Sequence, residues 1–223
     1  MKTHSEQLFE KFCEANGLVA NRIPTQNRRT PDYEVCRRGK SVIFEIKQLN
    51  PNPKDMRAIE ALHRDDAFAD YLRNRVRDVL KDVSPQLKAA RQASKPGVLV
   101  VYNNTPFSAG TDPDSVLQAM FGRKQISVTF KEDGSAVASE PFLAGNEGLT
   151  PMHNRSVSAL VVLRRRDDGS FFLDVFHNPW ASIKLGADWF AGLPARQLGV
   201  TDDGHLRAAS GTWPELRGRI VEP

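Results

Sequence analysis

Apolar and polar residues alternate from Phe44 to Lys47, with the period of two that is typical of a β-strand. Val42, Phe44 and Ile46 form an apolar stripe, which predicts a face turned toward the core. Glu45 and Lys47 occupy the alternate positions, so we expect both side chains on the opposite face. The pattern therefore places a carboxylate and an ammonium group next to each other on a strand that is anchored in the core.

A hairpin is expected to bring this strand back alongside the residues that precede it. Residues 33–36 have strand-forming composition, and residues 37–40 contain a glycine and form a turn signal. Antiparallel pairing across that turn carries Asp32 toward Glu45 and Lys47. Two carboxylates and one ammonium group would then meet at one end of the hairpin.

Helical periodicity appears before and after this hairpin. Apolar residues at positions 8, 9, 12 and 13 share one face of a helix that is expected to end near Asn16-Gly17. Residues 55–82 are mostly compatible with helix. Ser84-Pro85 predicts the start of a separate helix over 86–93, with the serine as its N-cap and the proline at its first position.

The second half of the chain continues with strands and one more helix. Residues 97–102 predict a strand, and Asp112-Pro113 predicts the start of a helix that reaches about Phe121. Residues 157–164 and 171–176 flank a turn and predict a hairpin, which we expect beside the 97–102 strand. The stretch 139–154 is interpreted as a long loop.

Composition limits the class of protein. The 223 residues are 40% hydrophobic and 26% charged, which is ordinary for a soluble globular protein, and no linker divides them, so we expect one domain over 1–223. No apolar run approaches a membrane span, and the first residues lack a secretory signal. Cys13 and Cys36 have no metal-ligand spacing and fit a reducing, cytoplasmic location.

Charge favours a polyanionic partner. The formal net charge is +4, and Arg28 and Arg29 stand just before Pro31-Asp32. Arginines at such a position are candidate phosphate contacts, with a solvated surface as the alternative. Other basic residues near the hairpin are Arg22, Arg37, Arg38 and Lys40.

The hairpin residues have the chemistry of a magnesium site. Mg²⁺ prefers oxygen ligands and usually keeps several waters, so Asp32, Glu45 and the backbone carbonyl of Ile46 would suffice to hold it. Lys47 could orient a water molecule and stabilise negative charge that develops on a phosphate. The alternative is that Glu45 and Lys47 form a solvated ion pair on an exposed sheet face.

Pro31-Asp32 followed by Glu45-Ile46-Lys47 resembles the PD-(D/E)xK nuclease superfamily. The resemblance implies an α/β (α+β) fold of the restriction-endonuclease-like type, a mixed β-sheet flanked by helices. It covers residues 1–103, so residues 104–223 would extend this core, with a C-terminal β-hairpin elaboration. It also implies a phosphodiesterase that depends on Mg²⁺ or Mn²⁺, with Asp32 and Glu45 as metal ligands and Lys47 as the catalytic lysine.

Three further residues enter through the same resemblance. Many members of the superfamily begin with a helix whose glutamate reaches the metal site, and Glu6 matches that glutamate, with Glu10 as the competing choice. Gln48, directly after the lysine, is similar to RecB-like members and is a candidate nucleic-acid contact. Gln86 could match a glutamine that some members carry on the helix after the E-x-K strand.

The expected function is hydrolysis of nucleic-acid phosphodiester bonds, with DNA placed ahead of RNA. Two alternatives remain open on the sequence. One is a module that binds nucleic acid or a protein without turnover, and the other is an accessory protein whose partner supplies specificity. A homodimer is also left open, and no membrane partner is expected.

Overall fold

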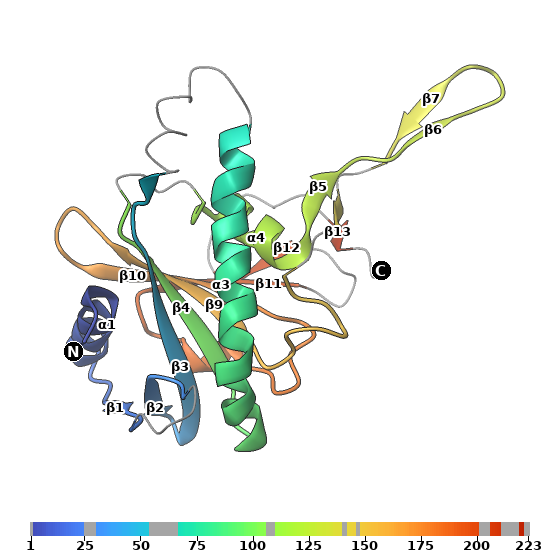
Figure 1. Ribbon diagram of the computed structural model, residues 1–223. Helices are drawn as coiled ribbons and strands as arrows, with labels where there is room; N and C mark the ends of the chain where they lie inside the picture. The colour runs from blue at the N-terminus through green and yellow to red at the C-terminus, as the bar shows by residue number, and fades with distance from the viewer. Residues whose placement is uncertain are drawn as a thin grey trace.

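Figure 1 shows the computed structural model, which describes residues 2–24, 30–53, 67–105, 110–139, 142–145, 148–200, 206–210 and 219–220. Its helices are α1 (His4–Ala15), α3 (Ala67–Gln92), α4 (Pro113–Phe121) and the 3-10 helix η1 (Ala187–Trp189). Its strands are β1 (Ala20–Arg22), β2 (Tyr33–Arg37), β3 (Lys40–Leu49), β4 (Gly97–Asn103), β5 (Arg123–Gln125), β6 (Val128–Phe130), β7 (Ala136–Ala138), β8 (Phe142–Ala144), β9 (Ala159–Arg165), β10 (Phe171–His177), β11 (Ala195–Val200), β12 (Leu206–Ser210) and β13 (Arg219–Ile220).

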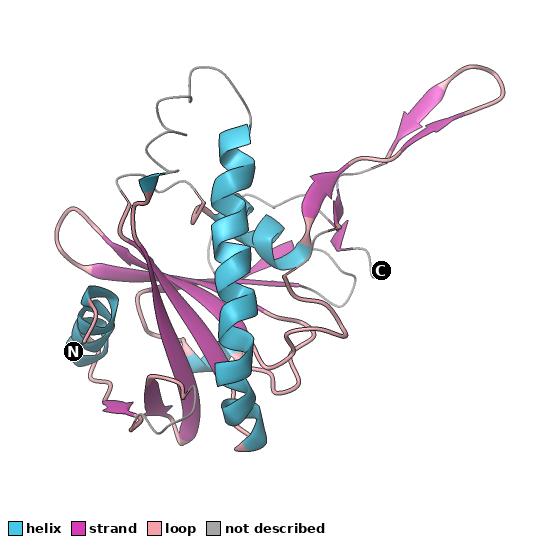
Figure 2. Cartoon of the chain, in the orientation of Figure 1, coloured by secondary structure: helices cyan, strands magenta, loops and turns pink. Residues whose placement is uncertain are grey.

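Eight of the described strands form one mixed sheet in the order β1-β2-β3-β4-β9-β10-β11-β12. Strands β3, β4 and β9 run parallel to one another, whereas β2/β3 and β9/β10 are antiparallel hairpins. Helices lie against this sheet, as the colouring in Figure 2 makes clear. The expectation of a mixed α/β fold with a sheet flanked by helices is therefore confirmed.

The β2–β3 hairpin forms where the alternating pattern predicts it. Tyr33 pairs with Phe44, and Val35 pairs with Val42. The turn places Arg38 and Gly39 at φ angles of 50° and 74°. Positive φ at both central residues matches the right-handed twist of the strands in a tight hairpin, and glycine adopts it without steric cost.

Strand β3 is buried on both faces, each against a different set of helices. The stripe Val42, Phe44 and Ile46 packs with α1 and with aromatic residues near η1, as the alternation predicts. The opposite face packs against α3, and Ile43 lies in that second core, to which α4 also contributes. Figure 1 shows α3 crossing this face of the sheet. The side on which Glu45 lies is therefore covered by a helix rather than by solvent.

The expected start of a new helix at Ser84-Pro85 is wrong, because α3 continues through both residues as one helix. A proline inside a helix removes one hydrogen-bond donor and crowds the preceding turn. The buried stripe Val76, Leu80, Val83 and Leu87 nevertheless runs across it against the sheet. Tertiary packing of that stripe outweighs the local start signal.

The later hairpin, β9–β10, lies inside the sheet and continues it beyond β4. Val98 pairs with Ala159, so the predicted position beside the 97–102 strand is confirmed. Strands β11 and β12, which the sequence did not predict, extend the sheet further. The stretch 139–154 is not only loop, because it contains β8, which pairs with β5.

Candidate functional site

The hairpin register brings Asp32 directly beside the β3 residues that were expected to share its chemistry. The Asp32 N–H donates to the carbonyl oxygen of Phe44 at 3.1 Å. The Ile46 N–H donates to Asp32 Oδ2 at 2.7 Å. These two bonds hold the Asp32 carboxylate next to Glu45, across the open end of the hairpin.

Glu45 is buried, with only 1% of its surface exposed. Its Oε1 lies 2.7 Å from Lys47 Nζ and accepts a hydrogen bond from Gln86 Nε2 of α3 at 2.8 Å. Within the described part of the chain, no donor reaches its second oxygen, Oε2. The alternative of a solvated surface pair is therefore wrong for Glu45, because α3 covers this face of β3.

The pKa values of both carboxyl groups are raised. Burial is the main cause of the raised pKa of Glu45, which reaches about 7, and the charge of Asp32 adds to it. The pKa of Asp32 is also raised, chiefly by burial, although the Ile46 N–H opposes the shift. The negative charge of half-buried Asp32 next to buried Glu45 favours a proton or a bound cation at this position.

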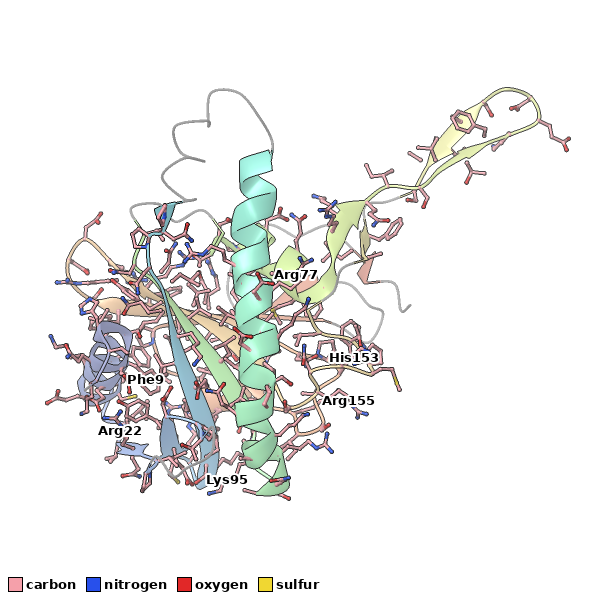
Figure 3. All side chains as sticks on the ribbon, viewed as in Figure 1. Phe9, Arg22, Arg77, Lys95, His153 and Arg155 are labelled. Atoms are coloured by element: carbon pink, nitrogen blue, oxygen red, sulfur yellow. The ribbon has the colours of Figure 1, made fainter. Side chains whose placement is uncertain are left out.

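Glu6 lies near this pair, but its oxygens are held by other groups. Its Oε2 accepts from the Thr3 N–H at 2.6 Å and from the Thr3 hydroxyl at 2.8 Å, and its Oε1 pairs with Arg22 at 3.1 Å. Together with the bond from the Glu6 N–H to the Thr3 hydroxyl, this is a capping box at the start of α1. Its negative charge still contributes to the raised pKa of Asp32 and Glu45. Figure 3 labels Arg22 beside α1.

The competing glutamate, Glu10, is engaged elsewhere on α1. It accepts a hydrogen bond from the Tyr33 hydroxyl at 2.9 Å and pairs with Lys2 at 2.7 Å. The capping box of Glu6 had a sequence signal of its own, the spacing of Thr3 and Glu6, which the sequence interpretation did not use. Of the two glutamates, Glu6 is the one whose charge acts on both Asp32 and Glu45.

Gln48 anchors the start of α1 to β3. Its Oε1 accepts from the Ser5 N–H at 3.0 Å, and its amide donates to Asn50. The Ile46 side chain packs in the core, 6% exposed, while its N–H holds Asp32. Arg28 and Arg29 lie outside the described residues.

Gln86 is the residue at this site that the sequence indicated least strongly. Periodicity alone does not separate a glutamine that faces a site from one on a solvated helix surface. Position 86 falls between Val83 and Leu87 on the side of α3 that packs on the sheet. The tertiary packing of α3 therefore directs the Gln86 amide onto Glu45.

The basic residues of the hairpin turn are not part of this site. Arg37 donates to the carbonyls of Trp189 and Ala191, and Arg38 donates to the carbonyl of Asp188 at 2.9 Å. Lys40 pairs with the Asp188 carboxylate at 2.8 Å. These three cations hold η1 against the turn of the hairpin. Their positive charge therefore has a structural role that requires no phosphate partner.

The donor atoms at the hairpin fit a hard divalent cation with few protein ligands. No group of three or more His, Cys, Asp or Glu side chains within the described ranges is arranged to hold a metal ion. Asp32 and Glu45 supply two carboxylates, and the buried Glu45 Oε2 is an acceptor without a donor. Mg²⁺ commonly binds one or two carboxylates and completes its shell with water and phosphate oxygens.

No protein-family model matches the chain, and no curated protein or solved structure is detectably similar to it. Across the described helices, none has both the length and the apolar character that a membrane crossing requires.

Proposed function

We propose that this chain is a nuclease of the PD-(D/E)xK type that depends on Mg²⁺ or Mn²⁺ and acts on DNA in preference to RNA. The observation that carries the proposal is the pairing of half-buried Asp32 with buried Glu45, which has Lys47 beside it on the same strand. A second carboxylate beside a buried one costs stability unless a proton or a cation compensates the charge. An ion pair with Lys47 needs only one carboxylate, so it does not explain why a second one lies beside it.

The order of the elements supports the restriction-endonuclease-like fold as part of this proposal. A helix, α1, comes before the hairpin, and the E-x-K strand β3 is followed by a long helix, α3, and then by the parallel strand β4. This is the core order that the resemblance implies. Asp32 and Glu45 stand together at the open end of the β2–β3 hairpin.

Each residue has a distinct role in the proposed reaction. Asp32 and Glu45 would hold the cation, which lowers the pKa of a bound water and polarises the phosphate. Lys47 is half-buried, with 34% of its side chain exposed, so its ammonium group can reach an incoming water or phosphate oxygen. Gln86 holds Glu45 Oε1 in place, and Oε2 is left as a buried acceptor without a donor among the described residues.

Cleavage assays with matched lysine variants test the proposal. Wild-type protein would be incubated with plasmid, linear duplex and single-stranded DNA and with RNA, each with Mg²⁺, Mn²⁺ or EDTA. We expect metal-dependent cleavage by wild type, with losses of about a hundredfold or more in Lys47→Ala and Asp32→Ala. Lys95→Ala is the control, because Lys95 forms an equivalent ion pair with Glu34 of the same hairpin, 2.6 Å away.

Two outcomes would overturn the assignment. Equal activity of wild type and Lys47→Ala would show that Lys47 has no role in cleavage and would indicate a contaminating nuclease. Salt-sensitive binding of DNA without cleavage under any metal would instead favour the non-catalytic binding module.

A further inference from the structure

A two-stranded ribbon projects from the body of the protein, and nothing in the proposed nuclease site uses it. It comprises β6, β7 and the turn between them, and together with Ile126 we call it the arm. Thr129 pairs with Val137 at its centre. Figure 1 shows the arm extending away from the main sheet, and Figure 3 shows its side chains standing clear of the rest of the molecule.

One face of the arm is apolar and exposed. Val128 is opposite Ala138 and Phe130 is opposite Ala136, so these four side chains share a face. Val128 is 51% exposed and Phe130 is 77% exposed, and Ile126 at the base of the arm is 57% exposed. An apolar stripe of this kind on a projecting element marks an interaction surface.

The arm also lacks the support that a ribbon of this size needs. A two-stranded hairpin alone is marginally stable in water, because it has no third strand or helix to cover its apolar face. Among the described strands, β6 and β7 pair only with each other. A partner that covers the stripe would stabilise the arm itself.

The sequence from Lys124 of β5 to Glu132 in the turn of the arm is chemically symmetric about Val128. Two positions to either side stand the large apolar residues Ile126 and Phe130. Four positions to either side stand opposite charges, Lys124 and Glu132, both exposed. A stripe of this kind is complementary to a second copy of itself that runs in the opposite direction.

We propose that the arm joins two copies of this chain, packed face to face and antiparallel about a two-fold axis at Val128. Ile126 then lies against Phe130 of the partner subunit, and Lys124 faces Glu132 of the partner subunit. Both of these contacts occur twice, as a two-fold interface requires. The alanines opposite Val128 and Phe130 leave room for the larger side chains of the other copy.

The charge at the tip of the arm argues against nucleic acid as the occupant. A two-stranded ribbon can enter the major groove of DNA, but its tip would meet phosphates on both sides. Lys131, Glu132 and Asp133 are all exposed at that tip, which gives it a net charge of −1. Phosphates repel the carboxylates at the tip. Lys124, at the base of the arm of a second copy, attracts them. The inference does not depend on the proposed nuclease activity.

Sedimentation velocity over a range from low micromolar to several hundred micromolar tests the interface. We expect a monomer–dimer equilibrium for wild type and a monomer throughout for Phe130→Asp. Val137→Asp is the control, because Val137 is 50% exposed on the opposite face of the same ribbon. A wild type that stays monomeric, or equal loss in both variants, would overturn the proposal.

Charge reversal tests the antiparallel arrangement separately. Lys124→Glu and Glu132→Lys each turn two attractive contacts repulsive, so each should weaken the dimer roughly tenfold. The double variant restores opposite charges and should return to within about threefold of wild type by the same reasoning. This dimer would be excluded if the double variant failed to recover. It would also be excluded if the variants changed DNA binding but left the sedimenting mass unchanged. Circular dichroism of each variant verifies that the body remains folded.

Discussion

Glu45 is the residue on which the proposed site depends. Its alternation with Phe44 and Ile46 sets the direction of its side chain, and burial under α3 then makes its charge costly. Lys47 compensates one oxygen at 2.7 Å, but Oε2 remains without a donor from the described residues. The raised pKa of Glu45 is the electrostatic consequence, and it has a measurable effect on stability.

The metal-free protein should lose stability as pH rises through the range set by Glu45. Its pKa rises from an ordinary 4.5 to about 7, so between these values the folded protein binds more protons than the unfolded chain. Raising the pH therefore favours unfolding, by on the order of 1–3 kcal/mol across that range for the coupled pair. Urea denaturation at a series of pH values in EDTA measures this loss.

Glu45→Gln should flatten that pH profile, because an amide does not titrate. Mg²⁺ should raise the stability of wild type near pH 7.5 and leave Glu45→Gln nearly unchanged. Glu34→Gln is the matched control. Lys95 holds the pKa of Glu34 below its ordinary value, so this carboxylate does not contribute to a loss of stability as pH rises. Superimposable profiles for wild type and Glu45→Gln would contradict the assignment of the shift to this residue.

At the scale of elements, ion pairs join the predicted β9–β10 hairpin to β11, a strand that the sequence pattern did not predict. Asp174 of β10 is fully buried and pairs with Arg164 of β9 and Arg196 of β11. Arg164 also donates to the Thr111 carbonyl just before α4. One carboxylate thus connects three neighbouring strands to the segment that leads into α4.

Asp174→Ala should therefore destabilise the fold strongly. Removing the carboxylate leaves two arginines, each less than one third exposed, without their counter-charge, at a cost of roughly 3 kcal/mol. Thermal or urea unfolding measures the loss. Asp188→Ala is the control: its ion pair with Lys40 is exposed, so the free energy of unfolding should barely change. Similar losses in both variants would rule out burial as the cause.

At the scale of the whole molecule, the net charge of +4 is only a mild attraction for a polyanion. Part of the positive charge is already engaged in structure. Arg37 and Arg38 bind carbonyls around η1, and Arg164 and Arg196 share Asp174. The number of cations that meet DNA should therefore be smaller than the composition suggests.

Binding of Lys47→Ala to duplex DNA should weaken linearly on a plot of log affinity against log salt. A slope of roughly −3 to −5 is expected, since each phosphate contact contributes about −0.9. Fluorescence anisotropy in Mg²⁺ between low and physiological salt measures it, and the inactive variant keeps the DNA intact. A slope near zero would exclude phosphate contacts as the source of affinity.

Local patterns were enough to predict the elements around the site. Period-two alternation identified β3, the turn at Gly39 identified the hairpin, and the apolar face of residues 8–13 identified α1. The helix start at Ser84-Pro85 failed, because a cap signal is local whereas the stripe that crosses it packs on a distant strand. Gln86 was weakly indicated for the same reason.

The sequence by itself determined that Asp32, Glu45 and Lys47 would meet, because strand alternation and hairpin register depend only on neighbouring residues. Only the tertiary structure decided that α3 would bury Glu45, that Thr3 and Arg22 would hold Glu6, and that the arm would stand exposed. Burial and charge compensation arise between segments far apart in the chain, so no local pattern contains them.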